Sequence, residues 1–144
     1  MIDKLVVAKD SYKLNHIPTL VYAALTDLSS YPTWWPGAKF TLENDQTLIV
    51  KPSGFGSFTW TTQEFVKDKK MILRYEGMFE GTGTWELMQR GSYTEVVYKV
   101  ELIINHPLMR WINKFVPVAT LHSRMMPKVF KSLDTYLNNC HVKV

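Results

Sequence analysis

Three polar residues lie among apolar ones at positions where chemistry could be done: His122, Tyr98 and Tyr75. His122 falls near the centre of an apolar helical arc, and each tyrosine alternates with apolar residues along a predicted strand. If these side chains converge in one cavity, they can hydrogen-bond a ligand carbonyl or hydroxyl group, or act as acid and base. The alternative is that His122 is a core histidine with satisfied hydrogen bonds and that the tyrosines only pack.

Most other catalytic patterns are absent from the sequence. The four histidines show no metal-ligand spacing and one cysteine cannot form a thiolate cluster, so we predict no metal site. No Walker or strand–GxGxxG–helix pattern occurs, and we predict no cofactor. Cys140 falls on the apolar arc near the chain end, where we expect a buried, inert thiol rather than a nucleophile.

The elements that must position these candidates follow from the residue pattern. Residues 5–15 are rich in β-branched and aromatic side chains and predict a first strand. Pro18 suits the first turn of a helix, and a second short helix is expected near Tyr31. The period then changes to two, which predicts six strands between residues 39 and 103. Because Trp34 and Trp35 are consecutive, we expect one to cap a cavity and the other to pack outside.

The last predicted hairpin has a two-residue loop, Gly91-Ser92, with glycine first as a type II′ turn requires. This register places Trp85 opposite Tyr98 on an apolar face, and puts mostly charged residues on the other face. The sheet is therefore predicted to be covered on one side and to meet water on the other.

The hairpin before it is predicted to join strands 57–66 and 71–79. Alternation places Phe65 and Tyr75 on one face, and it places Glu64 nearly opposite Arg74 on the other. Because apolar residues such as Trp60 occur on that second face too, alternation leaves open which face lines a cavity. An inward Glu64–Arg74 pair would be a charged wall, and an outward pair would be an ordinary surface pair.

The C-terminal segment, residues 107–139, carries a strong amphipathic helical pattern with basic residues on its polar arc. Pro117 is expected to kink this helix or to separate a short first helix from the main one. The apolar arc, predicted to cover the sheet, comprises Leu108, Trp111, Ile112, Phe115, Ala119, His122, Met125, Met126, Val129, Phe130, Leu133, Tyr136 and Leu137.

These elements together predict an α+β fold in one domain spanning residues 1–144. A curved antiparallel sheet of about seven strands is expected to wrap around the long C-terminal helix. Two short helices follow the first strand.

Three stretches of the chain resemble the START-like or SRPBCC superfamily, which includes polyketide cyclases, dehydrases and lipid-transport proteins. Residues 17–27 are similar to its first-helix pattern, in which an apolar residue and proline precede a helix ending in Leu and Asp. Residues 31–37, with two tryptophans between prolines, resemble its aromatic turn. Residues 83–87 and 94–96, followed by the amphipathic C-terminal helix, resemble its closing hairpin and lid helix.

The resemblance implies a helix-grip fold with a hydrophobic cavity between the curved sheet and the long helix. Members of the superfamily bind lipids, polyketides, quinones, hormones and similar molecules; some are cyclases or dehydrases, and some are adaptors. The residues predicted to bind the ligand are Trp35, Phe65, Tyr75, Trp85, Tyr98, His122, Met125, Met126, Val129 and Leu133.

Three functions follow as hypotheses, because fold does not settle function. The first is binding, and possible transport, of a small hydrophobic ligand such as a lipid, quinone or polyketide. The second is an enzyme of the polyketide cyclase or dehydratase type that uses cavity His and Tyr side chains. The third is an adaptor that contacts a protein or a membrane surface through the basic outer face of the C-terminal helix.

The charge distribution bears on partners and location. The formal net charge is +4, and residues 107–144 carry six basic residues against one acid, Asp134. This excess is too small to predict nucleic-acid binding, and a solvated helix face is its ordinary explanation. No signal peptide or membrane-spanning stretch is visible, and the single cysteine cannot form an internal disulfide. We therefore expect a cytoplasmic protein with at most peripheral membrane contact.

Overall fold

A computed structural model describes residues 5–52 and 56–142, with side chains as far as Asn139. The prediction for the Cys140 thiol lies outside the described side chains. The backbone forms one antiparallel sheet of seven strands in the order β1-β7-β6-β5-β4-β3-β2. The strands are β1 (Val6–Leu14), β2 (Ala38–Asn44), β3 (Thr47–Pro52), β4 (Phe58–Val66), β5 (Lys70–Gly77), β6 (Phe79–Arg90) and β7 (Tyr93–Ile104).

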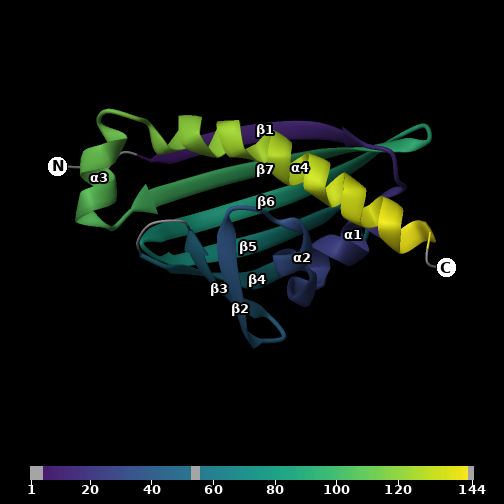
Figure 1. The fold of residues 1–144 in the computed structure, drawn as a ribbon, viewed down its shortest axis with the longest axis horizontal. Coiled ribbons are helices and arrows are strands. Elements are labelled where there is room, and N and C mark those ends of the chain that lie inside the picture. The colour runs from purple at the N-terminus through teal and green to yellow at the C-terminus, as the bar shows by residue number, and fades with distance from the viewer. Residues whose placement is uncertain (1–4, 53–55, 143–144) are drawn as a thin grey trace.

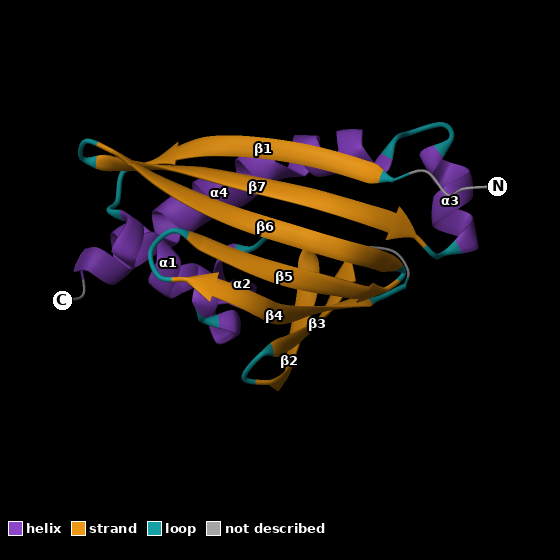
Figure 2. Ribbon diagram, turned by 180° about the vertical axis from the view of Figure 1, so that it is seen from behind, coloured by secondary structure: helices purple, strands orange, loops and turns teal. Residues whose placement is uncertain are grey.

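Helices cover one face of this sheet and leave the other bare. Helix α4 crosses the sheet diagonally, with α1 and α2 beside its C-terminal half (Figure 1). Seen from behind, the strands lie in front of all three helices (Figure 2). The helical elements are α1 (Pro18–Thr26), the 3-10 turn η1 (Leu28–Ser30), α2 (Tyr31–Trp34), α3 (Pro107–Asn113) and α4 (Val118–Val142). This is the predicted helix-grip arrangement of a curved sheet around a C-terminal helix.

The β6–β7 hairpin forms in the predicted register. Arg90 pairs with Tyr93 and Trp85 with Tyr98, and the turn glycine, Gly91, has a φ of 63°. Trp85 and Tyr98 are fully buried and stack with ring centroids 4.2 Å apart. The apolar face of this hairpin therefore forms the centre of the core.

The predicted pairing of Glu64 with Arg74 is wrong, because the turn joins Val66 to Lys70 and β4 carries a bulge between Thr62 and Glu64. Glu64 pairs with Ile72, while Arg74 pairs with Thr61. A bulge inserts one extra residue and so reverses which side chains face the core. Glu64 and Arg74 are both exposed, so they form no charged cavity wall.

On the other side of this bulge, Trp60 pairs with Tyr75, and both side chains face the helices. The inner face of the hairpin is therefore the one that carries Phe58, Trp60, Leu73 and Tyr75. Phe65 pairs with the buried Met71 but lies at the end of β4, where it is 48% exposed.

Both consecutive tryptophans are buried, which corrects the prediction that one packs outside. Trp34 is the last residue of α2, and its indole Nε1 donates a hydrogen bond to Ser30 Oγ over 2.9 Å. Trp35 is extended, with a ψ of 110°, so its ring points in a different direction and meets Trp60 edge-on with centroids 5.1 Å apart. The abrupt end of α2 lets both rings enter the core.

The C-terminal segment is broken before Pro117, not merely kinked. Helix α3 ends at Asn113, whose Oδ1 accepts a hydrogen bond of 2.7 Å from the backbone N–H of Val118 at the start of α4. The apolar arc is consequently divided. Its C-terminal part, including Met126 and Phe130, is buried on the sheet, whereas Leu108 and Trp111 of α3 are exposed. In the described part of the chain, no helix is long and apolar enough to cross a membrane.

Candidate functional site

A cavity of about 220 Å³ lies between the inner face of the sheet and the helices α3 and α4. Its walls are mainly aromatic and aliphatic, and three methionines, Met78, Met109 and Met125, take part in them. Methionine side chains are flexible, so such walls can adapt to ligands of different shape. The lining comprises Trp35, Gly37, Ala38, Val50, Pro52, Phe58, Trp60, Tyr75, Met78, Phe79, Leu102, Met109, Val118, Leu121, His122 and Met125.

Two of the lining residues carry a polar side-chain group: Tyr75 from β5 and His122 from α4. A few placed polar groups in an apolar pocket are what orients a small ligand. The structure therefore brings together two of the three residues that the sequence marked as candidates for chemistry.

The third candidate, Tyr98, lies behind the cavity wall and joins the other two. Its hydroxyl group hydrogen-bonds that of Tyr75, and its ring stacks on His122 with centroids 5.7 Å apart. Burial raises the pKa of both phenols above the ordinary value. Both tyrosines therefore stay neutral and can donate hydrogen bonds at physiological pH.

His122 is held from its other side by Asp10 of β1. Nδ1 of the imidazole lies 3.4 Å from Asp10 Oδ2, and the side chains of the two residues are 13% and 16% exposed. No hydrogen bond of regular geometry reaches this nitrogen from the described residues, so the contact is electrostatic. The Ser123 hydroxyl donates to the same carboxylate oxygen over 3.3 Å. The Asp10 carboxylate thus lies beside Nδ1 of the imidazole and is itself held by Ser123.

The charge state of His122 follows from two opposing effects. Burial lowers the pKa of the imidazole below its ordinary 6.5, and the neighbouring Asp10 carboxylate raises it by a smaller amount. The net shift is downward, so the ring is neutral at pH 7. A neutral imidazole at an apolar cavity can accept a proton or a hydrogen bond from a ligand.

Asp10 was not among the predicted site residues, although the pattern of its strand marks it. Residues 6, 8, 10, 12 and 14 of the first strand alternate toward the core, and Asp10 is the acidic residue among Val6, Ala8, Tyr12 and Leu14. An acidic residue on an otherwise apolar strand face is a candidate functional residue for the same reason as His122, a polar residue on the apolar face of its helix.

The structure divides the predicted ligand-binding residues into three groups. Trp35, Tyr75, His122 and Met125 line the cavity. Five others are fully buried behind the walls and contribute packing instead, because alternation predicts the face of a residue but not its depth: Trp85, Tyr98, Met126, Val129 and Leu133. Phe65 lies outside the cavity altogether, since its position at the outer end of β4 takes it beyond the reach of α4.

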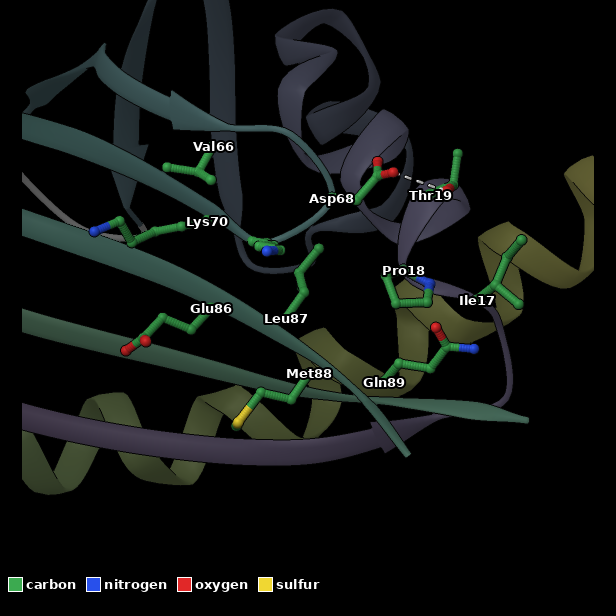
Figure 3. A pocket seen from close by; sticks show the side chains of 11 residues that line it. Ile17, Pro18, Thr19, Val66, Asp68, Lys70, Glu86, Leu87, Met88 and Gln89 are labelled. Atoms are coloured by element: carbon green, nitrogen blue, oxygen red, sulfur yellow. Dashed lines mark hydrogen bonds between the residues drawn. The ribbon is translucent and has the colours of Figure 1, made fainter. Parts of the chain in front are cut away.

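A second, larger hollow of about 620 Å³ lies between the N-terminus of α1 and the ends of β4, β5 and β6 (Figure 3). Two of its lining residues are joined by a hydrogen bond, which Thr19 Oγ1 donates to Asp68 Oδ2 over 3.0 Å (Figure 3). Charged side chains, among them Lys70 and Glu86, line this second hollow together with Leu87. Its mixed lining suits a hydrophobic ligand less than the aromatic cavity does.

Within the described residues, no three His, Cys, Asp or Glu side chains come together in a group that could hold a metal ion. His122 and Asp10 form a pair only. The chemistry available at the cavity is therefore that of the imidazole, the carboxylate behind it and the tyrosine hydroxyl groups.

A curved sheet that grips a C-terminal helix over an apolar cavity defines a START-like protein. The chain belongs to the polyketide cyclase/dehydrase and lipid transport family, whose sequence profile matches residues 10–138. No curated protein matches the sequence.

Several solved structures share this fold. A START superfamily protein from Mycobacterium smegmatis superposes with a TM-score of 0.72 at 14% identity, covering 93% of this chain and 98% of that chain. A norcoclaurine synthase point mutant from Thalictrum flavum, in complex with a transition-state analogue, gives 0.72 at 10% identity, covering 98% and 99%. An aromatase/cyclase from a Streptomyces species gives 0.64 at 10% identity, covering 90% and 94%. At these identities the likeness concerns the fold alone.

Proposed function

We propose that the protein binds a compact hydrophobic molecule in the cavity between α4 and the sheet. One observation carries the proposal: the aromatic and aliphatic lining of this cavity includes two residues that carry a polar side-chain group, Tyr75 and His122. A ligand with an apolar body and one carbonyl or hydroxyl group satisfies both kinds of surface. The family includes lipid-transport proteins, which agrees with such a role.

The size of the cavity narrows the class of ligand. Its volume of about 220 Å³ is below the roughly 300–1,000 Å³ of pockets for drug-sized molecules. A quinone or polyketide-derived ring system of a few rings fits this space better than an intact two-chain lipid. Met109 and Met125 can make room for a substituent by changing rotamer.

Isothermal titration of the full chain against compact quinones, naphthols and two-chain lipids tests this proposal. We expect saturable binding of at least one compact ring compound, together with an increase in melting temperature from preferential binding to the folded state. Tight binding of intact two-chain lipids alone would contradict the size argument. Binding that leaves the fluorescence of the cavity-lining Trp35 and Trp60 unchanged would place the ligand elsewhere.

A second function, an enzyme of the cyclase or dehydratase type, is supported by the Asp10–His122 contact at the cavity. Neutral His122 would remove a proton from the carbon beside a ligand carbonyl and become an imidazolium next to the Asp10 carboxylate. The Tyr75 hydroxyl group, while accepting a hydrogen bond from Tyr98, would donate one to the enolate oxygen. In a dehydration, the imidazolium would return this proton to the hydroxyl group that leaves as water.

Incubation with a poly-β-ketone mimic, followed by mass spectrometry for the loss of water, tests the enzymatic alternative. We expect His122→Gln to abolish turnover and Asp10→Asn to lower it by roughly 10²–10⁴-fold, as for the loss of a residue that supports a general base. Equal turnover by wild type and His122→Gln would exclude the enzymatic alternative.

Since the single cysteine of the chain cannot form an internal disulfide, we also propose that the protein works in a reducing cytoplasm.

A further inference from the structure

Five large apolar side chains lie exposed on α3, on the turn that follows it and on the first turn of α4, at one end of the molecule. Helix α3 stands beyond the end of the sheet in both views (Figures 1 and 2). Trp111 is 58% exposed and Phe115 is 69% exposed. We call this surface the tip patch; it consists of Leu108, Trp111, Phe115, Val116 and Leu121.

The two aromatic residues of the tip patch contact each other, and its other members lie within six residues of them in the chain. The rings of Trp111 and Phe115 meet edge-on with centroids 5.1 Å apart. Asn113 Oδ1 accepts a hydrogen bond from the Val118 N–H, and this bond fixes the turn that presents both rings. Contiguous exposed apolar surface of this kind marks an interaction site on a folded protein.

The chain segment that carries the tip patch has charged residues of one sign. No acidic residue occurs between Glu101 and Asp134, and this stretch contains five basic residues. Lys114 and Arg124, which flank the patch, are both exposed. Tryptophan and phenylalanine beside lysine and arginine are the composition of helices that lie in the interface of an anionic membrane. An apolar groove on a protein partner would not by itself require this charge.

The tip patch also borders the ligand cavity. Leu121 belongs to both, since it is 40% exposed and lines the cavity together with Met109 and Val118. A surface in contact with lipid at this point would bring the cavity next to a reservoir of hydrophobic molecules. That consequence rests on the proposed function, whereas the membrane contact itself does not.

We propose that the tip patch docks on the surface of an anionic lipid bilayer, with Trp111 and Phe115 entering the interface between headgroups and acyl chains. The apolar side chains supply the insertion, and Lys114 and Arg124 supply the attraction to anionic headgroups. Loss of one fully inserted aromatic side chain should weaken binding roughly tenfold or more.

The five tryptophans of the chain provide an internal probe of this contact. Trp34, Trp35, Trp60 and Trp85 are buried, and Trp111 is exposed. We expect vesicles of phosphatidylcholine with phosphatidylglycerol to shift the Trp111 emission to the blue, and brominated lipid to quench it. Vesicles of phosphatidylcholine alone should bind less, and added salt should weaken the anionic binding. Trp111→Phe should abolish the spectral response while largely keeping co-sedimentation.

Matched variants distinguish vesicle binding through the tip patch from nonspecific adsorption of the protein to vesicles. Phe115→Ser should weaken vesicle binding roughly tenfold or more, whereas Phe65→Ser, at an exposed phenylalanine on β4, should leave it unchanged. Lys114→Glu should weaken binding to the anionic vesicles more than Lys39→Glu does.

Three outcomes would overturn the proposal. The first is no co-sedimentation with anionic vesicles, and the second is binding that Phe115→Ser leaves intact. The third is a dimer that Phe115→Ser dissociates, without vesicle binding, which would assign the patch to self-association. Because none of these measurements uses a cavity ligand, failure here leaves the ligand-binding proposal standing, and the reverse also holds.

Discussion

The hydroxyl groups of Tyr75 and Tyr98 hydrogen-bond across Gly83, which lies on the strand between theirs. Tyr75 is on β5 and Tyr98 on β7, and β6 separates the two strands. An ideal Cβ on Gly83 would lie 2.7 Å from the Tyr98 hydroxyl oxygen and 2.8 Å from Tyr75 Cε1. The absence of a side chain at Gly83 thus permits the bond that couples a cavity-lining tyrosine to the tyrosine stacked on His122.

Removing either hydroxyl group should leave the other buried and unpaired. We expect Tyr75→Phe and Tyr98→Phe each to lower the free energy of unfolding by about 1–3 kcal/mol. The double variant should lose less than the sum of the single losses, because it leaves no unpaired hydroxyl group. Urea denaturation of the four proteins of this double-mutant cycle measures the coupling.

Tyr93→Phe is the control for this cycle, because Tyr93 is only half-buried, at the β6–β7 turn. Its loss of a hydroxyl group should change the free energy of unfolding by no more than about 0.5 kcal/mol. Strictly additive losses at Tyr75 and Tyr98 would show that the two hydroxyl groups do not depend on each other.

A side chain at Gly83 should force the tyrosines apart. We expect Gly83→Ala to lower the free energy of unfolding by about 1–3 kcal/mol, as overpacking of a tight core does. Combining it with Tyr98→Phe removes the oxygen that the new methyl group meets, so the pair should lose less than the sum of the two losses. A Gly83→Ala protein as stable as wild type would mean that the rings move aside without cost.

The sequence predicted the fold because its strongest signals are local. A glycine-first turn defined the β6–β7 register, and the periodicity of the C-terminal segment defined the helix that covers the sheet. The β4–β5 register could not be predicted in the same way. The bulge at Thr62–Glu64 adds one residue without a glycine or proline to mark it, and one residue reverses the faces of a strand.

Neighbouring positions in the candidate site were predictable where a polar residue interrupts an apolar pattern, as at His122, Tyr75 and Tyr98. Depth was not predictable, because alternation does not separate a cavity wall from the packed layer behind it; Val129 and Leu133 are buried in that layer. The division of the C-terminal helix also depends on tertiary contacts. One continuous apolar pattern therefore became two surfaces, one on the sheet and one exposed on α3.

Filling the cavity should remove the proposed ligand binding while preserving the fold. Val118 is buried and lines the cavity at the start of α4. We expect Val118→Phe to weaken the binding of a compact ring ligand roughly tenfold or more, because the new ring occupies the same space. Titration calorimetry measures the affinity. Thermal unfolding should show unchanged stability or a gain of up to about 1 kcal/mol, since the ring fills empty volume.

Val7→Phe is the matched control for this substitution, because Val7 is exposed on β1 and lies outside the cavity. It introduces the same side chain, and ligand affinity should be unchanged. Unaltered affinity in Val118→Phe, with its stability intact, would show that the ligand binds elsewhere.

The buried imidazole of His122 should make the protein less stable in acid. Burial holds the pKa of His122 below its ordinary 6.5 in the folded state, whereas in the unfolded chain the pKa is about 6.5. Between these two values the unfolded state binds a proton that the folded state does not. The free energy of unfolding therefore falls as the pH drops below about 6.5, and this loss stops below the folded pKa. Chemical denaturation at successive pH values measures it.

Two variants isolate this contribution of His122. His122→Gln places an uncharged amide on the helix, so stability should depend less on pH between neutrality and mild acid than it does in wild type. Asp10→Asn keeps the imidazole but removes the carboxylate that raises its pKa. The pKa of His122, followed by NMR through its ring protons, should then fall further. The decrease in the free energy of unfolding should continue to lower pH. An unchanged pKa in Asp10→Asn would show that the 3.4 Å contact carries no electrostatic coupling.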